Sequence, residues 1–406
     1  MNFLRAVCRL LAGIAFIVSG YFKAVDPIGV ILKIKEYFHA FHIDFIDFAA
    51  TPLALFLCAA EFVIGVAVLK GIKMKWFTRF ALWFISFFTF ITAINLIFNL
   101  VQDCGCFGEI IHFTNFQTLL KNVVLLFAIL FIYFDRDKFL PIATPKWEWI
   151  YLLFYFLFIF FIEIYSLIYN PILDFGTYKV GTDLNSLTGE APMHDYEAVF
   201  IYEKEGIQKE FSLDNLPDST WKYVDTKTEL LNADSIASET ANFVLKNDAG
   251  EYITSQILES ETPTFFLSFY NVDKIGEKTI QKIISLNDSI SVNGGVLYGL
   301  SGNSVEETQI VANKLPFNFL YSDYKTVLSF NRINGGLTYV NNGIIVMKRG
   351  RNEYKPTKIN KLISNDPQII AAESVIKEKL FMEISLLFIL SLIGVLRFVS
   401  KRMYLK

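Results

Sequence analysis

Long apolar blocks alternate with short polar stretches through the first 170 residues, and one further block lies near the C-terminus. A helix needs about 20 apolar residues to cross the hydrocarbon core of a bilayer. Six blocks are long enough and predict membrane-spanning helices: Leu4–Phe22, Pro52–Leu69, Phe77–Leu100, Phe116–Phe134, Trp149–Tyr169 and Leu380–Val399. Arg5 and Arg9 make the first block similar to a signal peptide, but no small-x-small cleavage site follows it. We therefore interpret it as a retained helix.

Residues 171 to 378 have the mixed apolar and polar pattern of a soluble domain. Up to residue 240 the pattern predicts a hairpin at Ala198–Leu213, turning at Glu205-Gly206, and a short strand at Thr220–Asp225. Later elements alternate: strand Thr264–Tyr270, helix Glu277–Leu286, strand Gly295–Ser301, a helix opened by the capping box Ser304-x-x-Glu307, and hairpin Leu337–Lys348, turning at Asn341-Asn342-Gly343. Strands that alternate with helices predict an α/β domain.

Composition supports a membrane protein that carries a soluble domain. Of 406 residues, 53% are hydrophobic and 19% are charged, which is less charge than a soluble protein of this size carries. The formal net charge of −3, without a basic stripe, gives no reason to expect nucleic-acid binding. Four cysteines are too few for a disulfide-stapled scaffold, and none lies between residues 171 and 378. Cys8 and Cys58 are expected to be buried apolar residues.

Lysine and arginine in short loops predict the orientation of the helices, because they concentrate on the cytoplasmic side. With both termini cytoplasmic, these residues fall on that side: Arg5, Arg9, Lys70, Lys73, Lys75, Arg79, Arg136, Lys138, Lys146, Lys401, Arg402 and Lys406. The first outer loop is the exception, since it contains Lys23, Lys33 and Lys35 among acidic residues. The large domain between the fifth and sixth helices then lies in the periplasm, and the protein in the inner membrane.

Two cysteines stand one residue apart in the loop DCGCFGE, between the third and fourth predicted helices. No lysine or arginine lies between residues 101 and 120, so this loop also faces the outer side. Disulfides persist there, and the small ring that Cys104, Gly105 and Cys106 close would be strained and readily reduced. We favour thiol–disulfide exchange. A static clip and a metal site that includes His112 are the alternatives.

Polar side chains within the predicted helices indicate a second candidate site. Glu61 falls near the middle of the second helix, where an ionisable group costs several kcal/mol unless it is paired or hydrated. Lys23 and Asp26, at the outer end of the first helix, could reach a polar site together with Asn95 of the third. The alternative is structural: Lys23 extends to the membrane interface, and Glu61 bonds to Asn95.

Three patterns within residues 1–140 resemble the DoxX-like membrane proteins. SGYFKAVDP (Ser19–Pro27) is similar to their SG-x-x-K-x-x-DP signature, and Ala49–Gly71 resembles their second helix, with a proline at its entry and a buried glutamate. DCGCFGE resembles the Cys-x-Cys-x-x-Gly turn of the MauE branch, the methylamine-utilisation accessory proteins, although Gly108 comes one residue early. The resemblance implies a four-helix core that supports disulfide formation in periplasmic partners and suggests a membrane quinone as cofactor. Related quinone-coupled thiol oxidases use two cysteine pairs, and this sequence has one.

Residues 241–350 resemble a thioredoxin-like fold. Asn242–Leu258 is similar to the opening hairpin of peroxiredoxin- and TlpA-like members, and the later elements follow in their order. The active-site cysteines of that fold would lie in Asn271–Lys278, which contains none, and its cis-proline would fall at or near Gly335. Without a thiolate the domain has no nucleophile for exchange. We therefore expect it to dock a partner.

The fold class predicted is a membrane helical bundle with an inserted extracytoplasmic α/β domain, divided as follows: four-helix membrane domain 1–140, fifth helix 147–170, β-rich segment 171–240, thioredoxin-like domain 241–350, connector 351–379, C-terminal helix 380–399 and cytoplasmic tail 400–406. The first hypothesis is that Cys104 and Cys106 exchange with the thiols of a periplasmic protein partner. The alternative is a non-catalytic assembly factor or scaffold with a structural Cys-Gly-Cys loop. Transport is a third hypothesis, but no internal repeat or pair of broken helices supports it.

Overall fold

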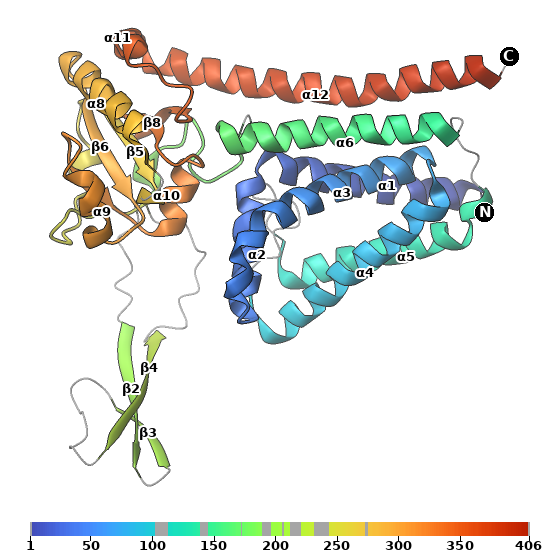
Figure 1. The fold of residues 1–406 in the computed structure, drawn as a ribbon, viewed down its shortest axis with the longest axis horizontal. Helices are drawn as coiled ribbons and strands as arrows, with labels where there is room; N and C mark the ends of the chain where they lie inside the picture. The colour runs from blue at the N-terminus through green and yellow to red at the C-terminus, as the bar shows by residue number, and fades with distance from the viewer. Residues whose placement is uncertain are drawn as a thin grey trace.

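The computed structural model describes residues 2–101, 113–138, 145–171, 173–188, 196–204, 207–211, 221–230, 243–272 and 275–404. These residues form a bundle of long helices, an α/β domain at one end of the bundle and a small three-stranded sheet (Figure 1). α1, the first helix, begins at the side of the bundle opposite the α/β domain, and α12, the last helix, ends at that side (Figure 1).

Five of the described helices are long and apolar enough to cross a membrane: α1 (Asn2–Val25), α3 (Ala50–Lys70), α4 (Met74–Phe98), α5 (Asn115–Phe134) and α6 (Pro145–Ile168). They confirm the first five predicted spans, with small differences at the ends. The sixth predicted span lies within α12 (Pro367–Tyr404), a helix that begins well before Leu380. Phe381 of α12 packs against an apolar cluster that includes Ile159 of α6. That α12 crosses the membrane stays a prediction.

Glycines let α1 and α3 approach each other closely at the centre of the bundle. A Cβ atom added at Gly20 of α1 would lie 2.6 Å from the backbone nitrogen of Phe62 in α3. A Cβ atom added at Gly65 of α3 would lie 2.6 Å from the backbone nitrogen of Ile17 in α1. The two helices therefore touch along their backbones. One apolar cluster joins them to α4 and α5, and another joins them to α6.

The predicted outer loop after the first span is largely helical. α2 (Pro27–Ala40) has a proline at its first position, and Asp26 caps it by accepting a hydrogen bond from the Gly29 backbone nitrogen. A residue with positive φ, His42, follows, and a 3₁₀ helix at Asp44–Ala49 leads into α3. α2 has no long apolar block, so its sequence does not predict a helix clearly. Its buried residues are Pro27, Ile28 and Phe38.

The α/β domain has a five-stranded sheet in the order β7-β6-β5-β8-β9. Its strands are β5 (Thr264–Phe269), β6 (Val296–Ser301), β7 (Phe319–Tyr321), β8 (Gly336–Asn341) and β9 (Ile344–Arg349). Its helices are α7 (Thr254–Leu258), α8 (Glu277–Val292), α9 (Val305–Ala312), α10 (Tyr324–Phe330) and α11 (Ile359–Ser364). β5, β6 and β7 are parallel, whereas β8 and β9 form an antiparallel hairpin beside β5. Two apolar clusters surround the sheet, and every residue of β5 is buried.

Most elements predicted for this domain are confirmed, and the differences are local. The capping box of Ser304 and Glu307 is present at the start of α9. α8 continues to Val292, past the predicted end at Leu286. Of the predicted opening hairpin, the described part keeps a single bridge between Lys246 and Tyr252, after which α7 begins. β7 and α10 are additional elements, too short to give a clear periodic signal.

The three-stranded sheet consists of β2 (Tyr196–Lys204), β3 (Ile207–Phe211) and β4 (Lys222–Leu230), in the order β3-β2-β4. All its strand pairs are antiparallel. The pairing of β2 with β3 confirms the predicted hairpin, and β4 confirms the predicted strand that follows it. This sheet stands apart from the five-stranded sheet (Figure 1).

Ion pairs mark the two ends of the bundle. Three pairs lie at the end where the chain begins: Arg5–Asp135, Lys73–Glu148 and Lys75–Asp137. Two pairs join the other end to the α/β domain: Lys325–Glu36 and Arg332–Asp26. The described lysines and arginines assigned to the cytoplasmic side therefore gather at one end of the bundle. Which end faces the cytoplasm stays a prediction.

Candidate functional site

A buried ion pair lies inside the bundle, between α1 and α3. The ammonium of Lys23 donates a hydrogen bond to the Glu61 carboxylate, with 2.6 Å between Nζ and Oε2. The two side chains are only 11% and 9% exposed. The Lys23 ammonium also lies 5.7 Å from the centre of the Phe88 ring. The structure thus brings together two of the four residues predicted for the polar site, and the lysine neutralises a carboxylate that would be costly alone at this depth.

The pair lines a cavity of about 30 Å³ between α1, α3, α4 and α5. A buried water needs roughly 10–15 Å³ on this measure, so the cavity has room for about two waters. Its lining combines polar and aromatic side chains, namely Ser19, Lys121 and Asn122 with Phe16, Phe84 and Phe88. Asn122 is oriented by a hydrogen bond to the Thr92 hydroxyl, 3.2 Å away. The arrangement can hold a hydrated charge or a proton, but it is too small for a bulky ligand.

Asn95 belongs to a different network, at the end of α4. Its side-chain nitrogen donates to the Val101 carbonyl and to Asn115 Oδ1, each at 2.8 Å, and its oxygen accepts from the Val101 backbone nitrogen at 2.7 Å. Asn115, at the start of α5, also donates to the Val101 carbonyl. Asn95 therefore does not join Glu61. It fixes the positions at which the chain leaves α4 and enters α5.

Cys104 and Cys106, the predicted catalytic residues, lie outside the described residues, and so does His112. The helices that flank this segment, α4 and α5, have their adjoining ends near α2 (Figure 1). Cys58 is a free and fully buried thiol, as expected, and Cys8 is partly buried.

Asp26 joins the bundle to the α/β domain. Its Oδ1 caps α2, and its Oδ2 accepts a hydrogen bond from the Arg332 guanidinium at 2.8 Å. Arg332 is 5% exposed, so this contact between the two parts of the molecule excludes most water. Lys23 and Asp26, from one short motif, thus have different partners. Lys23 reaches into the bundle, and Asp26 holds the domain that sits on it.

A pocket of about 390 Å³ lies between α2, the end of α4 and α10. Its lining combines charged, histidine and apolar side chains: Lys33, Glu36, His39, Ala40, Leu100, Val101 and Lys325. Burial would raise the pKa of Glu36, but the ammonium groups of Lys33 and Lys325 hold that pKa below its usual value. Val101, the last described residue before the Cys-Gly-Cys segment, therefore lies beside this pocket.

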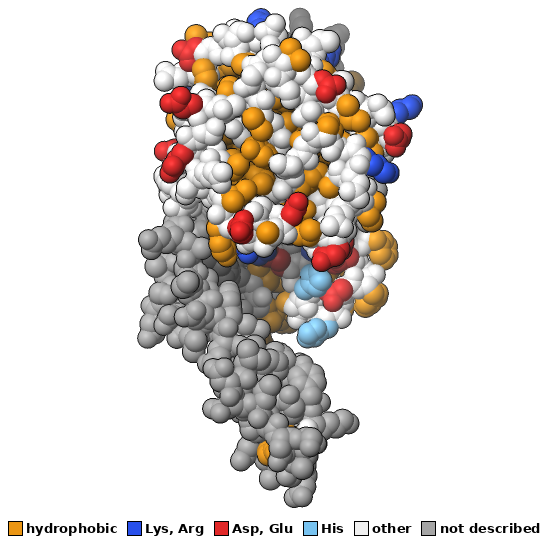
Figure 2. Space-filling model, turned by 90° about the vertical axis from the view of Figure 1, so that its left-hand side faces the viewer, with side chains coloured by type: hydrophobic (Ala, Val, Ile, Leu, Met, Phe, Trp, Pro, Cys, Tyr) orange, Lys and Arg blue, Asp and Glu red, His pale blue; other side chains and the backbone are white. Residues whose placement is uncertain are grey.

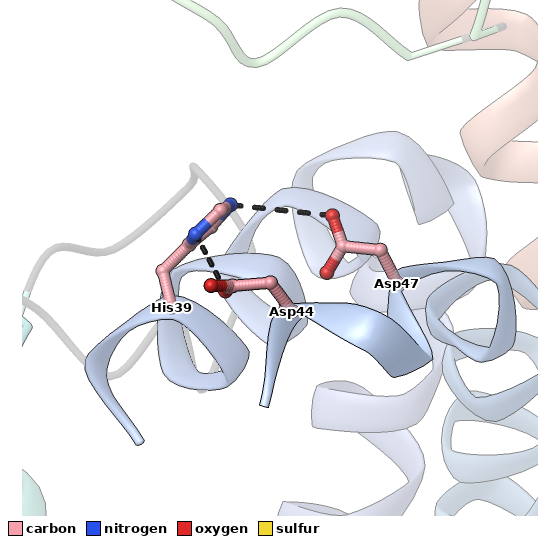
Figure 3. A group of neighbouring side chains, drawn as sticks. All are labelled: His39, Asp44 and Asp47. Carbon is pink, nitrogen blue, oxygen red and sulfur yellow. Dashed lines mark ion pairs between the residues drawn. The ribbon is translucent and has the colours of Figure 1, made fainter. Parts of the chain in front are cut away.

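The α2 end of the bundle also carries a surface cluster of His39, Asp44 and Asp47 (Figure 3). His39 Nδ1 lies 2.6 Å from Asp44 Oδ1, and His39 Nε2 lies 4.0 Å from Asp47 Oδ2. Seen from this end, the described histidine side chains lie below the α/β domain (Figure 2). The three residues offer ligand atoms within 4.8 Å of one another. However, the two ring nitrogens face different carboxylates, and Lys35 lies 3.7 Å from Asp47. The geometry is that of an ion-pair cluster that braces the turn between α2 and α3.

A third pocket, of about 190 Å³, separates the end of α6 from β9 and α12. Burial would raise the pKa of Asp174, but the Lys348 ammonium, 2.5 Å from its Oδ2, holds that pKa below its usual value. Glu378 of α12 lines the same pocket, and burial, together with the nearby charge of Asp174, raises its pKa to about 7. The pocket therefore contains a carboxyl group that titrates near neutral pH.

Replacing Glu378 by glutamine is expected to stabilise the protein above pH 7 and to have little effect near pH 5. The folded state holds a proton on Glu378 up to about pH 7, while the unfolded chain loses it near the ordinary value of 4.5. The wild-type contribution of this group is therefore lost as pH rises between these values. The measurement is the melting temperature of the purified protein from pH 5 to 8.5. Glu373→Gln, at an exposed position of the same helix, is the matched control and should keep the wild-type profile.

Several residues of these sites were not among the predicted site residues. Lys121 and Asn122 line the cavity near the start of α5, and their polarity within an apolar block was the signal that could have identified them. Lys325 and Arg332 gave no local signal. Arg332 meets Asp26 across 306 positions of sequence, and only the folded structure brings them together.

Comparisons with known proteins agree with this architecture. Residues 1–135 match the family described as Methylamine utilisation protein MauE. Residues 196–233, which contain the three-stranded sheet, match a Domain of unknown function (DUF8463). Protein TlpB of Flavobacterium psychrophilum is 22% identical over 145 residues, and this match spans 34% of the chain and 38% of that protein. No solved structure matches the chain significantly.

The match over residues 1–135 covers the helices α1 to α5, including both members of the buried ion pair, Lys23 and Glu61. It confirms the resemblance that the sequence motifs indicate. The bundle formed by residues 1–135 is therefore a membrane domain of the MauE family.

Proposed function

We propose that the chain is a thiol–disulfide exchange protein of the cytoplasmic membrane, or an accessory to one. Cys104 and Cys106 exchange with the thiols of a protein partner that the α/β domain holds. In this proposal both termini are cytoplasmic, α12 is a sixth span and the α/β domain is periplasmic. The ion pairs Arg5–Asp135 and Lys73–Glu148, at the end opposite the α/β domain, support this orientation, because basic residues favour the cytoplasmic side.

The observation that carries the proposal is the position of Val101, the last described residue before the Cys-Gly-Cys segment, close to the α/β domain. Asn95 and Asn115 hold Val101 at the end of α4 that faces α2. The pocket beside Val101 is bridged by the pair Lys325–Glu36, so the α/β domain borders the same opening. A partner bound to the domain would therefore have its thiols close to the chain that carries Cys104 and Cys106.

The exchange step itself needs only these two cysteines and two partner thiols. A partner thiolate attacks one sulfur of the Cys104–Cys106 disulfide, and a mixed disulfide forms while the other cysteine leaves as a thiolate. The second partner thiolate then attacks the partner sulfur of the mixed disulfide, so the partner leaves oxidised and the pair is left reduced. The MauE resemblance suggests a membrane quinone as electron acceptor. The cavity beside Lys23 and Glu61 has room for only about two waters and does not fit a quinone ring.

We propose further that the α/β domain is thioredoxin-like and serves for docking. The parallel strands β5 and β6, joined by α8, and the antiparallel hairpin β8–β9 on the other side of β5 support this fold. Active thioredoxin-like proteins carry their cysteines in the loop after β5. Here Asn334 holds the start of that loop, because its Oδ1 accepts hydrogen bonds from the Tyr270 and Asn271 backbone nitrogens. No cysteine lies between residues 171 and 378, so exchange falls to the membrane domain.

Thiol trapping in membranes tests the proposal. In a Cys8→Ser/Cys58→Ala background, a maleimide reagent that adds mass at each thiol is applied before and after mild reduction. We expect Cys104 and Cys106 to change between reduced and oxidised forms. We also expect Cys106→Ser to accumulate a partner linked to Cys104 through a bond that reductant releases. The same experiment on the chain that retains Cys8 and Cys58 controls for effects of these two cysteines.

The second candidate is an assembly factor with a structural loop, and the Asn95 network favours it, because it already holds both ends of the loop in place. A pair that stays oxidised under mild reductant, together with a Cys104→Ser variant of unchanged phenotype, would support this candidate and contradict the exchange proposal.

A further inference from the structure

The bundle contains a buried carboxyl group that is not paired like the others. Each of three buried acidic side chains in or next to the spans has a basic partner: Glu61 with Lys23, Asp135 with Arg5, and Glu148 with Lys73. Glu163 of α6 is fully buried, and neither of its carboxyl oxygens has a hydrogen-bond partner among the described residues. Since an ionisable group within a span is retained at a cost, Glu163 requires a functional explanation.

The surroundings of Glu163 are largely apolar, and among the described residues the ammonium group of this region, that of Lys23, is already bonded to Glu61. Glu163 lies on the face of α6 that packs against α1 and α3, and the nearby Ser166 and Tyr155 hydroxyls are also buried without partners in the described structure. Cys58 of α3 lies within electrostatic range of Glu163, Glu61 and Lys23. The charged or titratable groups facing this region are Tyr21 and Lys23 of α1, Cys58 and Glu61 of α3, and Tyr155 of α6. α12 contributes Phe381 and Ser385, which do not titrate.

Charge balance then determines the state of Glu163. The region holds two carboxyl groups and one ammonium group, and that ammonium lies 2.6 Å from Glu61. A lone carboxylate in a medium of low dielectric is strongly unfavourable, and a buried group in this position is neutralised. We propose that Glu163 is a proton-binding site of the membrane domain, distinct from the Lys23–Glu61 pair, and that a proton is its ligand.

A polar pocket lies close to Glu163 along the chain. The pocket of about 190 Å³ at the end of α6 is lined by Tyr165, Asn170 and Glu378. Asn170 follows Glu163 by seven positions, which corresponds to about 10 Å along a helix axis. The Ser166 hydroxyl lies between them on the chain, one helical turn from Glu163. This inference does not depend on the thiol chemistry proposed for Cys104 and Cys106.

Labelling with dicyclohexylcarbodiimide, a hydrophobic reagent that attacks protonated carboxyl groups, tests the proposal on the full-length protein in membranes. Peptide mapping by mass spectrometry reads out the adduct at each carboxyl. Glu163 should be labelled at least about tenfold more than Glu61, which corresponds to about 1.4 kcal/mol between their free energies of protonation. Glu61 is the matched control, because it is also buried in the bundle but pairs with an ammonium group. Glu163→Gln should remove the adduct.

Two results would overturn the inference. Equal labelling of Glu61 and Glu163 would mean that the unpaired geometry does not determine protonation. Protection of Glu163 by sodium or potassium ions at constant pH would mean that a metal cation, and not a proton, is the ligand. Both comparisons use the wild-type chain, so they remain decisive even if Glu163→Gln fails to fold.

Discussion

Replacing Lys23 by methionine is expected to lower the free energy of unfolding by about 3–5 kcal/mol, because the Glu61 carboxyl group then loses its counter-ion and is buried either as a lone charge or at the cost of taking up a proton. The Glu61 side chain is 9% exposed, and the Lys23 ammonium 2.6 Å away is its hydrogen-bond donor. The adjacent cavity of about 30 Å³ holds too little water to solvate a carboxylate fully. Methionine keeps the length of the side chain, so the change removes mainly charge. The measurement is denaturant or thermal unfolding of the purified protein in detergent.

Two further variants separate the ion pair from other effects of the substitution. Lys23→Met combined with Glu61→Gln removes both charges and should recover most of the stability, since a buried pair can often be replaced by neutral groups at little cost. Lys33→Met is the matched control. Lys33 pairs with Glu36 at 2.9 Å, but these side chains are 28% and 26% exposed, so a loss below about 1 kcal/mol is expected. A double variant as unstable as Lys23→Met alone would mean that Lys23 acts through contacts other than Glu61.

The spans can be predicted from sequence because the bilayer sets one requirement, a long apolar helix, that each block meets on its own. β5 is equally clear, since its short run of buried residues needs no distant partner to be recognised. α2 is different. Lys33, Lys35 and Glu36 interrupt its apolar pattern, and it is placed by contacts with the bundle and with Lys325 of the α/β domain. Such contacts between distant segments leave no trace in local periodicity.

The candidate site was predictable only in part, for a related reason. A carboxyl group such as Glu61 in an apolar helix is a local signal, but its partner is not. Lys23 and Asn95 were both reasonable partners, and the way α1 packs on α3 decides in favour of Lys23. Asn95 instead satisfies the backbone groups of Val101, which follow the end of α4 and have no partner within that helix.

Replacing Gly20 by alanine is expected to lower the free energy of unfolding by about 1–3 kcal/mol, the usual cost of forcing a methyl group into a packed interior. The new Cβ would lie 2.6 Å from the Phe62 backbone nitrogen and 2.9 Å from the Phe62 Cα atom. A backbone cannot turn away as a flexible side chain does, so α1 and α3 must separate. Lys23 lies about one helical turn after Gly20 on α1, and Glu61 lies directly before Phe62 on α3. The separation should therefore also lengthen the buried ion pair.

Gly276→Ala is the matched control for this prediction, because a Cβ there meets no atom within 4 Å and its φ of −76° suits any residue. Its effect should stay at or below about 1 kcal/mol, the cost of alanine in place of glycine at the N-cap of α8. If the strain acts through the ion pair, Gly20→Ala should cost less in the Lys23→Met/Glu61→Gln background, since no charge is then left to separate. Equal losses in both backgrounds would mean that the glycine contact stabilises the bundle by backbone packing alone. A Gly20→Ala variant as stable as the wild type would show that α1 and α3 do not approach each other this closely.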